Sequence, residues 1–167
     1  YDLIDAGSTR YLFIYMGYHV EQDGIKWIKS VLEQYPDRVA VLCTHAYFDT
    51  DLTLLADGSP ERTVFPSYSG DAEMGEIARE NGWYLSFSGT SSYKGNDGIR
   101  ESAKLVGMSH VMVETDAPYL SPMPYRGRTN APYMIPYTLQ ALADYLDRPL
   151  AEIAKATRET TREVYGI

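Results

Sequence analysis

Short apolar runs alternate with amphipathic helical segments along this chain, and this alternation restricts the possible folds more than any other feature. The apolar runs that predict strands are residues 11–16, 39–44, 63–65, 83–88 and 111–115. The segments with the apolar spacing of helices are residues 25–35, 69–81, 97–106, 132–146 and 149–165. About five consecutive βα units predict an α/β fold with a parallel sheet.

The length of the chain limits how such a sheet can close. A complete TIM-type barrel takes about 250 residues, whereas this chain has 167. We therefore expect a single α/β domain over residues 1–167 that forms a partial TIM-type barrel, with a flattened flavodoxin-like sandwich as the alternative. A partial barrel exposes two sheet edges and apolar inner faces. It therefore predicts a homodimer, whereas the flattened sandwich predicts a monomer.

Charge and composition exclude several classes of function. The chain has 15 Lys and Arg against 23 Asp and Glu, a formal net charge of −8. This balance argues against tight nonspecific binding to nucleic-acid backbones, but a bound divalent metal can supply positive charge locally in a nuclease. No apolar run approaches the roughly 18–20 residues of a membrane helix. No secretory signal is visible and Cys43 is the single cysteine, which together predict a cytoplasmic protein.

Two polar residues directly follow predicted strands and are candidates for chemistry. His45 follows the run 39–44, and Asp116 follows the run 111–115. In parallel α/β folds the active site lies at the carboxyl ends of the strands, so we expect both side chains at the same end of the sheet. A histidine and a carboxylate there suit Mg, Mn or Zn, which predicts both as metal ligands and catalytic residues. The alternative is structural: a loop hydrogen bond for His45 and an Asp-Ala-Pro turn for Asp116.

Two other histidines are weaker candidates. His19 follows the first predicted strand, on the side of the sheet where a site is expected. His110 precedes a strand and is therefore expected at the opposite end, in a structural role.

Several motifs from about residue 57 to 167 resemble TatD-type metal-dependent deoxyribonucleases. They are Gly-Trp-Tyr-Leu-Ser-Phe-Ser-Gly at 82–89, Val-Glu-Thr-Asp-Ala-Pro-Tyr-Leu at 113–120, Pro-Tyr-Arg-Gly-Arg-Thr-Asn at 124–130 and a closing helix at 157–166. The resemblance implies a TIM-type, metal-dependent hydrolase that cleaves phosphodiesters in DNA. It also implies that Asp116 is the metal-binding aspartate after the last strand, and that Arg126 holds the loop or a substrate phosphate.

The chain departs from that family pattern at places that bear on the metal. Where the family has His-Cys-Phe-Ser-Gly, this chain has Pro-Ser-Tyr-Ser-Gly at 66–70, so Pro66 stands in place of a ligand histidine. The early His-x-His pair of the family has no counterpart. These departures predict an incomplete metal site in a TatD-like hydrolase of DNA phosphodiesters. The alternative is a non-catalytic chimeric or truncated scaffold built from metallohydrolase pieces.

The first 50 residues resemble a different group of metal enzymes. The runs 11–17 and 27–38 and the segment Val-Leu-Cys-Thr-His-Ala-Tyr at 41–47 are similar to a late segment of calcineurin-like metallophosphoesterases. In that family the histidine after this strand is a ligand of a two-metal centre, which His45 would match. The two resemblances predict a junction between two metallohydrolase-derived segments near residues 50–61.

Overall fold

The computed structural model describes residues 2–4, 11–16, 22–35, 39–44 and 62–167. The strands in this part of the chain are β1 (Asp2–Ile4), β2 (Tyr11–Met16), β3 (Val39–Thr44), β4 (Thr63–Phe65), β5 (Tyr84–Phe87) and β6 (Val111–Val113). The α-helices are α1 (Gln22–Gln34), α3 (Ala72–Glu80), α4 (Asp97–Val106), α5 (Ile135–Leu146) and α6 (Leu150–Tyr165). Among the described helices, none is both long and apolar enough to cross a membrane.

The strands follow one another across the sheet in chain order, β1-β2-β3-β4-β5-β6. From β2 to β6 every neighbouring pair is parallel, and β1 pairs with β2 antiparallel. Chain order is the order of a TIM-type barrel, whereas a flavodoxin-like sheet has the order 2-1-3-4-5. The prediction of an α/β fold with a parallel sheet is therefore confirmed. The sheet is open, and its strand order differs from that of the flavodoxin-like alternative.

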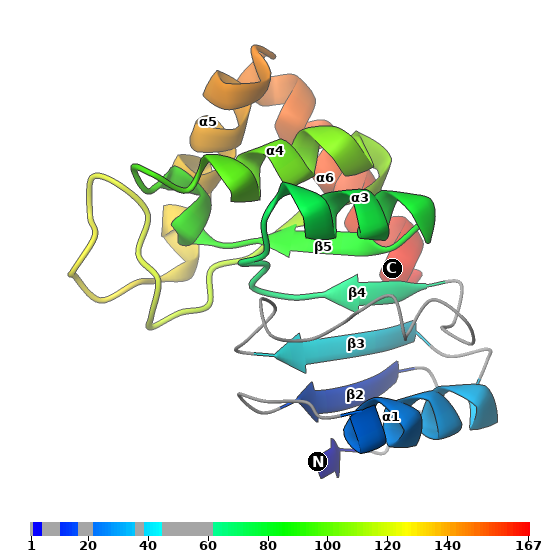
Figure 1. Cartoon of the computed structure of the whole chain (residues 1–167). Coiled ribbons are helices and arrows are strands. Elements are labelled where there is room, and N and C mark those ends of the chain that lie inside the picture. The colour runs from blue at the N-terminus through cyan, green and yellow to red at the C-terminus, as the bar shows by residue number, and fades with distance from the viewer. Residues whose placement is uncertain (1, 5–10, 17–21, 36–38, 45–61) are drawn as a thin grey trace.

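Side chains of the strands alternate between two apolar layers, as the pleat of a strand requires. One layer packs the sheet against residues of the helices, including Ile28 and Leu32 of α1 and Met74 and Ala78 of α3, and α1 and α3 lie in front of the strands in Figure 1. Its strand residues are Ala40, Phe65, Leu85, Phe87 and Val111. The opposite layer contains Val39, Val41, Val64, Tyr84 and Met112, together with Val164 from the end of α6. Burial on both faces explains why the strands read as continuous apolar runs.

Proline and capping residues set the ends of the helices. The side chain of Asp71 accepts a hydrogen bond from Met74 N (3.0 Å), so α3 begins at Ala72 rather than at the predicted residue 69. The predicted helix 132–146 is divided into a 3₁₀ turn, Pro132–Met134, and α5. Pro136 has no N–H to donate to Pro132, so a continuous α-helix cannot begin at that point. The helix predicted over 97–106 is confirmed, and Gly107, with φ 76°, caps its C-terminal end.

Candidate functional site

Asp116 lies in the loop that leaves the carboxyl end of β6. Glu114 N donates to Phe87 O (3.0 Å) and extends the pairing of β6 with β5 just beyond Val113. The backbone of Asp116 is left-handed, with φ 56°, and its carbonyl accepts a hydrogen bond from Tyr119 N (2.8 Å). A positive φ is uncommon outside glycine, and such conformations cluster at functional sites. The turn presents the Asp116 side chain to solvent at the strand end.

Glu114 brings the ends of three strands together beside Asp116. Its half-buried carboxylate accepts hydrogen bonds from the Ser86 hydroxyl of β5 and from the backbone N–H of Ser67, just after β4. Burial raises the pKa of Glu114 above its usual range and the nearby charge of Asp116 raises it further, while the two hydrogen bonds lower it. The carboxyl ends of β4, β5 and β6 therefore form one polar edge that carries two carboxylates. Sequence reasoning missed Glu114, although it is the charged residue within the run 111–115.

Asn130, which lies 14 residues after Asp116 in the sequence, holds the loop in this shape. Its side chain is buried, and Nδ2 donates to the carbonyls of Thr115 and Tyr119, both at 2.6 Å. Its Oδ1 accepts from Ala131 N (2.8 Å), and its backbone N–H donates to Pro118 O (3.0 Å). The amide thus fixes the carbonyls on either side of Asp116 and keeps the turn closed.

Replacing Asn130 by Ala is expected to lower the free energy of unfolding by about 2–3 kcal/mol, because two carbonyls lose their donor and each loss costs about 1 kcal/mol or more. The midpoint of urea unfolding measures this change. Asn96→Ala is the matched control, since the Asn96 amide donates one hydrogen bond, to Thr90 O (3.0 Å). Equal midpoints for the two variants would show that Asn130 does not hold the loop.

Arg126 joins the loop after β6 to the loop after β5. Its guanidinium lies 4.3 Å from the centre of the Tyr93 ring, a distance typical of a cation–π contact. The Tyr93 hydroxyl in turn donates to Ser121 O (3.0 Å). These two loops, residues 88–96 and 114–131, protrude together from the carboxyl ends of the strands (Figure 1). Arg126 thus contacts the neighbouring loop, and its binding of a substrate phosphate stays a prediction.

The predicted histidine ligand cannot be placed. His45 and His19 both lie outside the described residues, so the prediction that His45 faces Asp116 stays untested. Pro66 is described, and it is half-buried in the turn after β4. Within the described part of the chain, there is no group of three His, Cys, Asp or Glu side chains that could hold a metal ion.

His110 has the structural surroundings that the sequence predicts. It precedes β6, at the end of the sheet opposite Asp116. Its ring lies against the Tyr84 ring with centroids 4.9 Å apart, and its Nδ1 is 3.1 Å from Ser109 Oγ.

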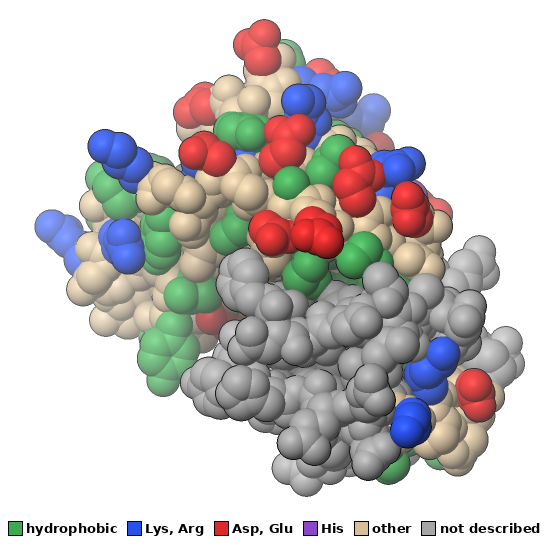
Figure 2. Space-filling model, in the orientation of Figure 1, with side chains coloured by type: hydrophobic (Ala, Val, Ile, Leu, Met, Phe, Trp, Pro, Cys, Tyr) green, Lys and Arg blue, Asp and Glu red, His purple; other side chains and the backbone are tan. Residues whose placement is uncertain are grey.

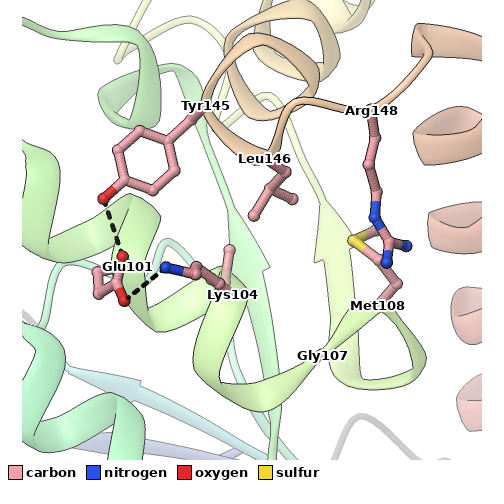
Figure 3. Close-up of a pocket in the computed structure, with 8 residues that line it drawn as sticks. Glu101, Lys104, Gly107, Met108, Tyr145, Leu146 and Arg148 are labelled. Carbon is pink, nitrogen blue, oxygen red and sulfur yellow. Dashed lines mark hydrogen bonds and ion pairs between the residues drawn. The ribbon is translucent and has the colours of Figure 1, made fainter.

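A cavity of about 480 Å³ lies on the helical side of the molecule, between α4, α5 and the turn that precedes β6 (Figure 3). Glu101 accepts a hydrogen bond from the Tyr145 hydroxyl (3.0 Å) and forms an ion pair with Lys104 (3.3 Å). Arg148 pairs with Glu152 (3.0 Å). The charged groups that line this cavity are thus paired. The cavity borders the turn before β6, whereas Asp116 follows β6, so the cavity is separate from the carboxyl-end edge.

Comparison with known proteins identifies the family. The family model described as "TatD related DNase" matches residues 37–166. This chain belongs to the TatD family. A metal-dependent hydrolase named TatD from Mycobacterium tuberculosis is 35% identical over 149 residues, which cover 89% of this chain and 56% of the relative. The metal-dependent hydrolase YabD of Bacillus subtilis is 28% identical over 118 residues, which cover 70% of this chain and 46% of the relative.

Solved structures of TatD proteins share the fold. The TatD homologue YjjV from Escherichia coli superposes with a TM-score of 0.73 at 20% identity, covering 91% of this chain and 62% of that chain. A TatD family hydrolase from Entamoeba histolytica gives a TM-score of 0.68 at 16% identity, covering 91% of this chain and 61% of that chain. The chain spans about half the length of the curated TatD relatives it matches.

The TatD match also corrects the interpretation of the first 50 residues. The family model begins at residue 37, and the mycobacterial TatD relative aligns with 89% of the chain. The alignment therefore reaches well into the segment that resembles calcineurin-like metallophosphoesterases, and that resemblance is wrong. An apolar strand followed by a histidine suits the functional edge of any parallel sheet, so it does not distinguish between metallohydrolase families. A single domain over 1–167 with a junction near 50–61 stays a prediction.

Proposed function

We propose that this chain hydrolyses phosphodiester bonds in DNA in a metal-dependent reaction centred on Asp116. The observation that carries the proposal is the placement of Asp116, which follows β6 directly in a left-handed turn beside the half-buried Glu114. In parallel α/β barrels the catalytic groups come from the ends of several strands. The family match adds the substrate class, since the matching model is one of TatD related DNases.

The donor chemistry of this edge suits a hard divalent cation. Carboxylate oxygens are preferred by Mg²⁺ and Mn²⁺, and Mg²⁺ is commonly bound through one or two carboxylates. Asp116 would hold the ion, and His45 would add a nitrogen ligand that also suits Zn²⁺. When bound, such an ion polarises a phosphoryl oxygen and lowers the pKa of water.

The side chains around Asp116 have supporting roles in this proposal. The hydrogen bonds from Ser86 and Ser67 would fix the orientation of the Glu114 carboxylate beside Asp116. Arg126 would bind a substrate phosphate from the loop that it anchors on Tyr93.

A non-catalytic scaffold with an incomplete metal site is the second candidate. Pro66, at the position where the family pattern has a ligand histidine, cannot coordinate a metal. The described residues also lack a group of three metal ligands, and a catalytic zinc centre normally takes three protein ligands. This candidate differs from the first in one measurable property, which is hydrolysis.

Removing metal is expected to abolish hydrolysis of DNA, and adding Mn²⁺ or Mg²⁺ back is expected to restore it, because the reaction depends on an ion held by Asp116. The measurement compares cleavage of single-stranded DNA and of a chromogenic phosphodiester after dialysis against EDTA and after re-addition of each ion. Metal content by mass spectrometry is determined on the same samples. Cleavage at the buffer level with every ion, together with no bound metal, would favour the scaffold.

Location and assembly are further proposals. We place the protein in the cytoplasm, where the single cysteine, Cys43, stays reduced. We also propose a homodimer, because the open sheet has two edges that a second copy can cover.

A further inference from the structure

A pocket of about 360 Å³ lies in the segment that follows the Asp116 turn. Tyrosines and an arginine form most of its wall, and the lining residues are Tyr125, Arg128, Thr129, Tyr133, Met134 and Tyr137. We refer to this pocket as the tyrosine pocket. It is joined to the Asp116 turn through Asn130, which donates to carbonyls of Thr115 and Pro118. A ligand seated in the tyrosine pocket is therefore held on the same loop as the candidate metal ligand.

The tyrosine pocket leaves aromatic surface exposed to solvent. The rings of Tyr125 and Tyr137 meet edge to face with centroids 4.9 Å apart, and their hydroxyls are 3.1 Å apart. This contact fixes the orientation of both rings. The side of the pocket formed by Tyr133 is open, since Tyr133 is 75% exposed and Tyr137 is 38% exposed. Aromatic faces that packing leaves uncovered can stack on a planar ligand.

The charge around the tyrosine pocket is opposite to that of the whole chain. Residues 117–143 contain Arg126 and Arg128 and no acidic residue, in a chain with a net charge of −8. Both arginines are exposed, and the Arg128 guanidinium lies 5.9 Å from the centre of the Tyr125 ring. Figure 2 shows basic side chains over the protruding loops, while acidic side chains gather over the helices. The surface beside the pocket therefore attracts an anionic ligand.

We propose that the tyrosine pocket seats an unpaired base of single-stranded DNA, with Tyr133 stacking on the base and Arg128 binding the adjoining phosphate. This inference rests on the proposed function, because it places the rest of a DNA strand next to the Asp116 turn. Stacking needs an exposed base face, which a single strand offers and an intact duplex does not. Phosphate contacts from arginine then fix the strand without reading its sequence.

The test is equilibrium binding of a fluorescent oligothymidylate, measured by anisotropy in EDTA so that metal-dependent hydrolysis is absent. Tyr133→Ala is expected to weaken binding at least fivefold, whereas Tyr133→Phe keeps the ring and is expected to bind as the wild type does. Arg128→Gln is expected to weaken binding and to reduce the slope of log K against log salt by about 0.7 for each lost phosphate contact. Arg158→Gln, at an exposed arginine on α6, is the matched control and is expected to leave the slope unchanged.

Each outcome decides between the pocket and its alternatives. Equal binding by Tyr133→Ala and the wild type, absence of binding by the wild type, or equal losses for Arg128→Gln and Arg158→Gln would each overturn the proposal. Circular dichroism of each variant confirms that a loss of binding does not come from unfolding. Binding with the expected pattern of variants, but without hydrolysis in any ion, would refute the hydrolase and support the pocket.

Discussion

Asp116→Asn is expected to lower metal-dependent hydrolysis of DNA by about 100-fold or more, because losing even a hydrogen-bonding partner of a metal ligand commonly costs 10–100-fold. The change removes the negative charge of the side chain and keeps its shape. Asn also tolerates the left-handed backbone better than most residues, so the turn at φ 56° is expected to persist. Initial rates with saturating Mn²⁺, together with the metal content of the protein, measure the loss.

The matched control for this variant is Asp147→Asn. Asp147 has a left-handed backbone as well, with φ 51°, but it lies at the end of α5, far along the chain from the Asp116 turn. The same chemical change is therefore made in the same backbone conformation, and it is expected to leave the rate unchanged. If both variants kept the wild-type rate of hydrolysis, Asp116 would not be a metal ligand, and the proposal that the reaction is centred on Asp116 would be wrong.

Gly89→Ala is expected to lower the free energy of unfolding by about 3 kcal/mol or more, which exceeds the usual cost of overpacking. A Cβ at Gly89 would lie 2.0 Å from Leu120 O and 2.7 Å from Pro122 N. Both of these are backbone atoms, so no side-chain rotation relieves the overlap. The two loops that protrude beside Asp116 would have to separate, and we expect hydrolysis to fall together with stability.

Gly98→Ala is the control for this second variant. A Cβ at Gly98 would meet Asp71 Cα at 3.4 Å, an ordinary contact distance, and alanine favours the helix α4 in which Gly98 lies. Urea unfolding is expected to show Gly98→Ala at or above the wild-type midpoint and Gly89→Ala well below it. Coinciding midpoints would mean that the two loops move apart at little cost.

The fold could be predicted from the sequence wherever a local sequence pattern determines the type and the length of a helix or strand. The apolar runs 11–16 and 39–44 form strands over their full lengths, as a continuous apolar run of strand length predicts. The predicted strand 111–115 was too long, since β6 ends at Val113 and Glu114 turns toward Ser86 and Ser67. The antiparallel pairing of β1 with β2 was not predicted, because a three-residue strand carries almost no periodic signal.

The candidate site was less predictable, because most of it depends on contacts between distant segments. Asp116 could be found from its place after a strand, a rule that follows from the parallel sheet alone. The role of Asn130 could not, since its amide donates to carbonyls 15 and 11 residues away, and nothing near it in the sequence indicates those partners. The exposure of Tyr133, which is 75% exposed, could not be predicted either, because the residues around it in the sequence do not show which tyrosines packing leaves uncovered.

The chain order of the strands has a consequence for how this sheet is assembled. Every parallel pairing from β2 to β6 joins a strand to the next strand along the chain, so no pairing has to skip over another strand of the sheet. Contacts between chain neighbours favour fast folding, and each new strand can dock on the edge left by the one before it, in the order of synthesis. A sheet built in this way grows by accretion, so its size can change by whole βα units without rearranging the strands already in place.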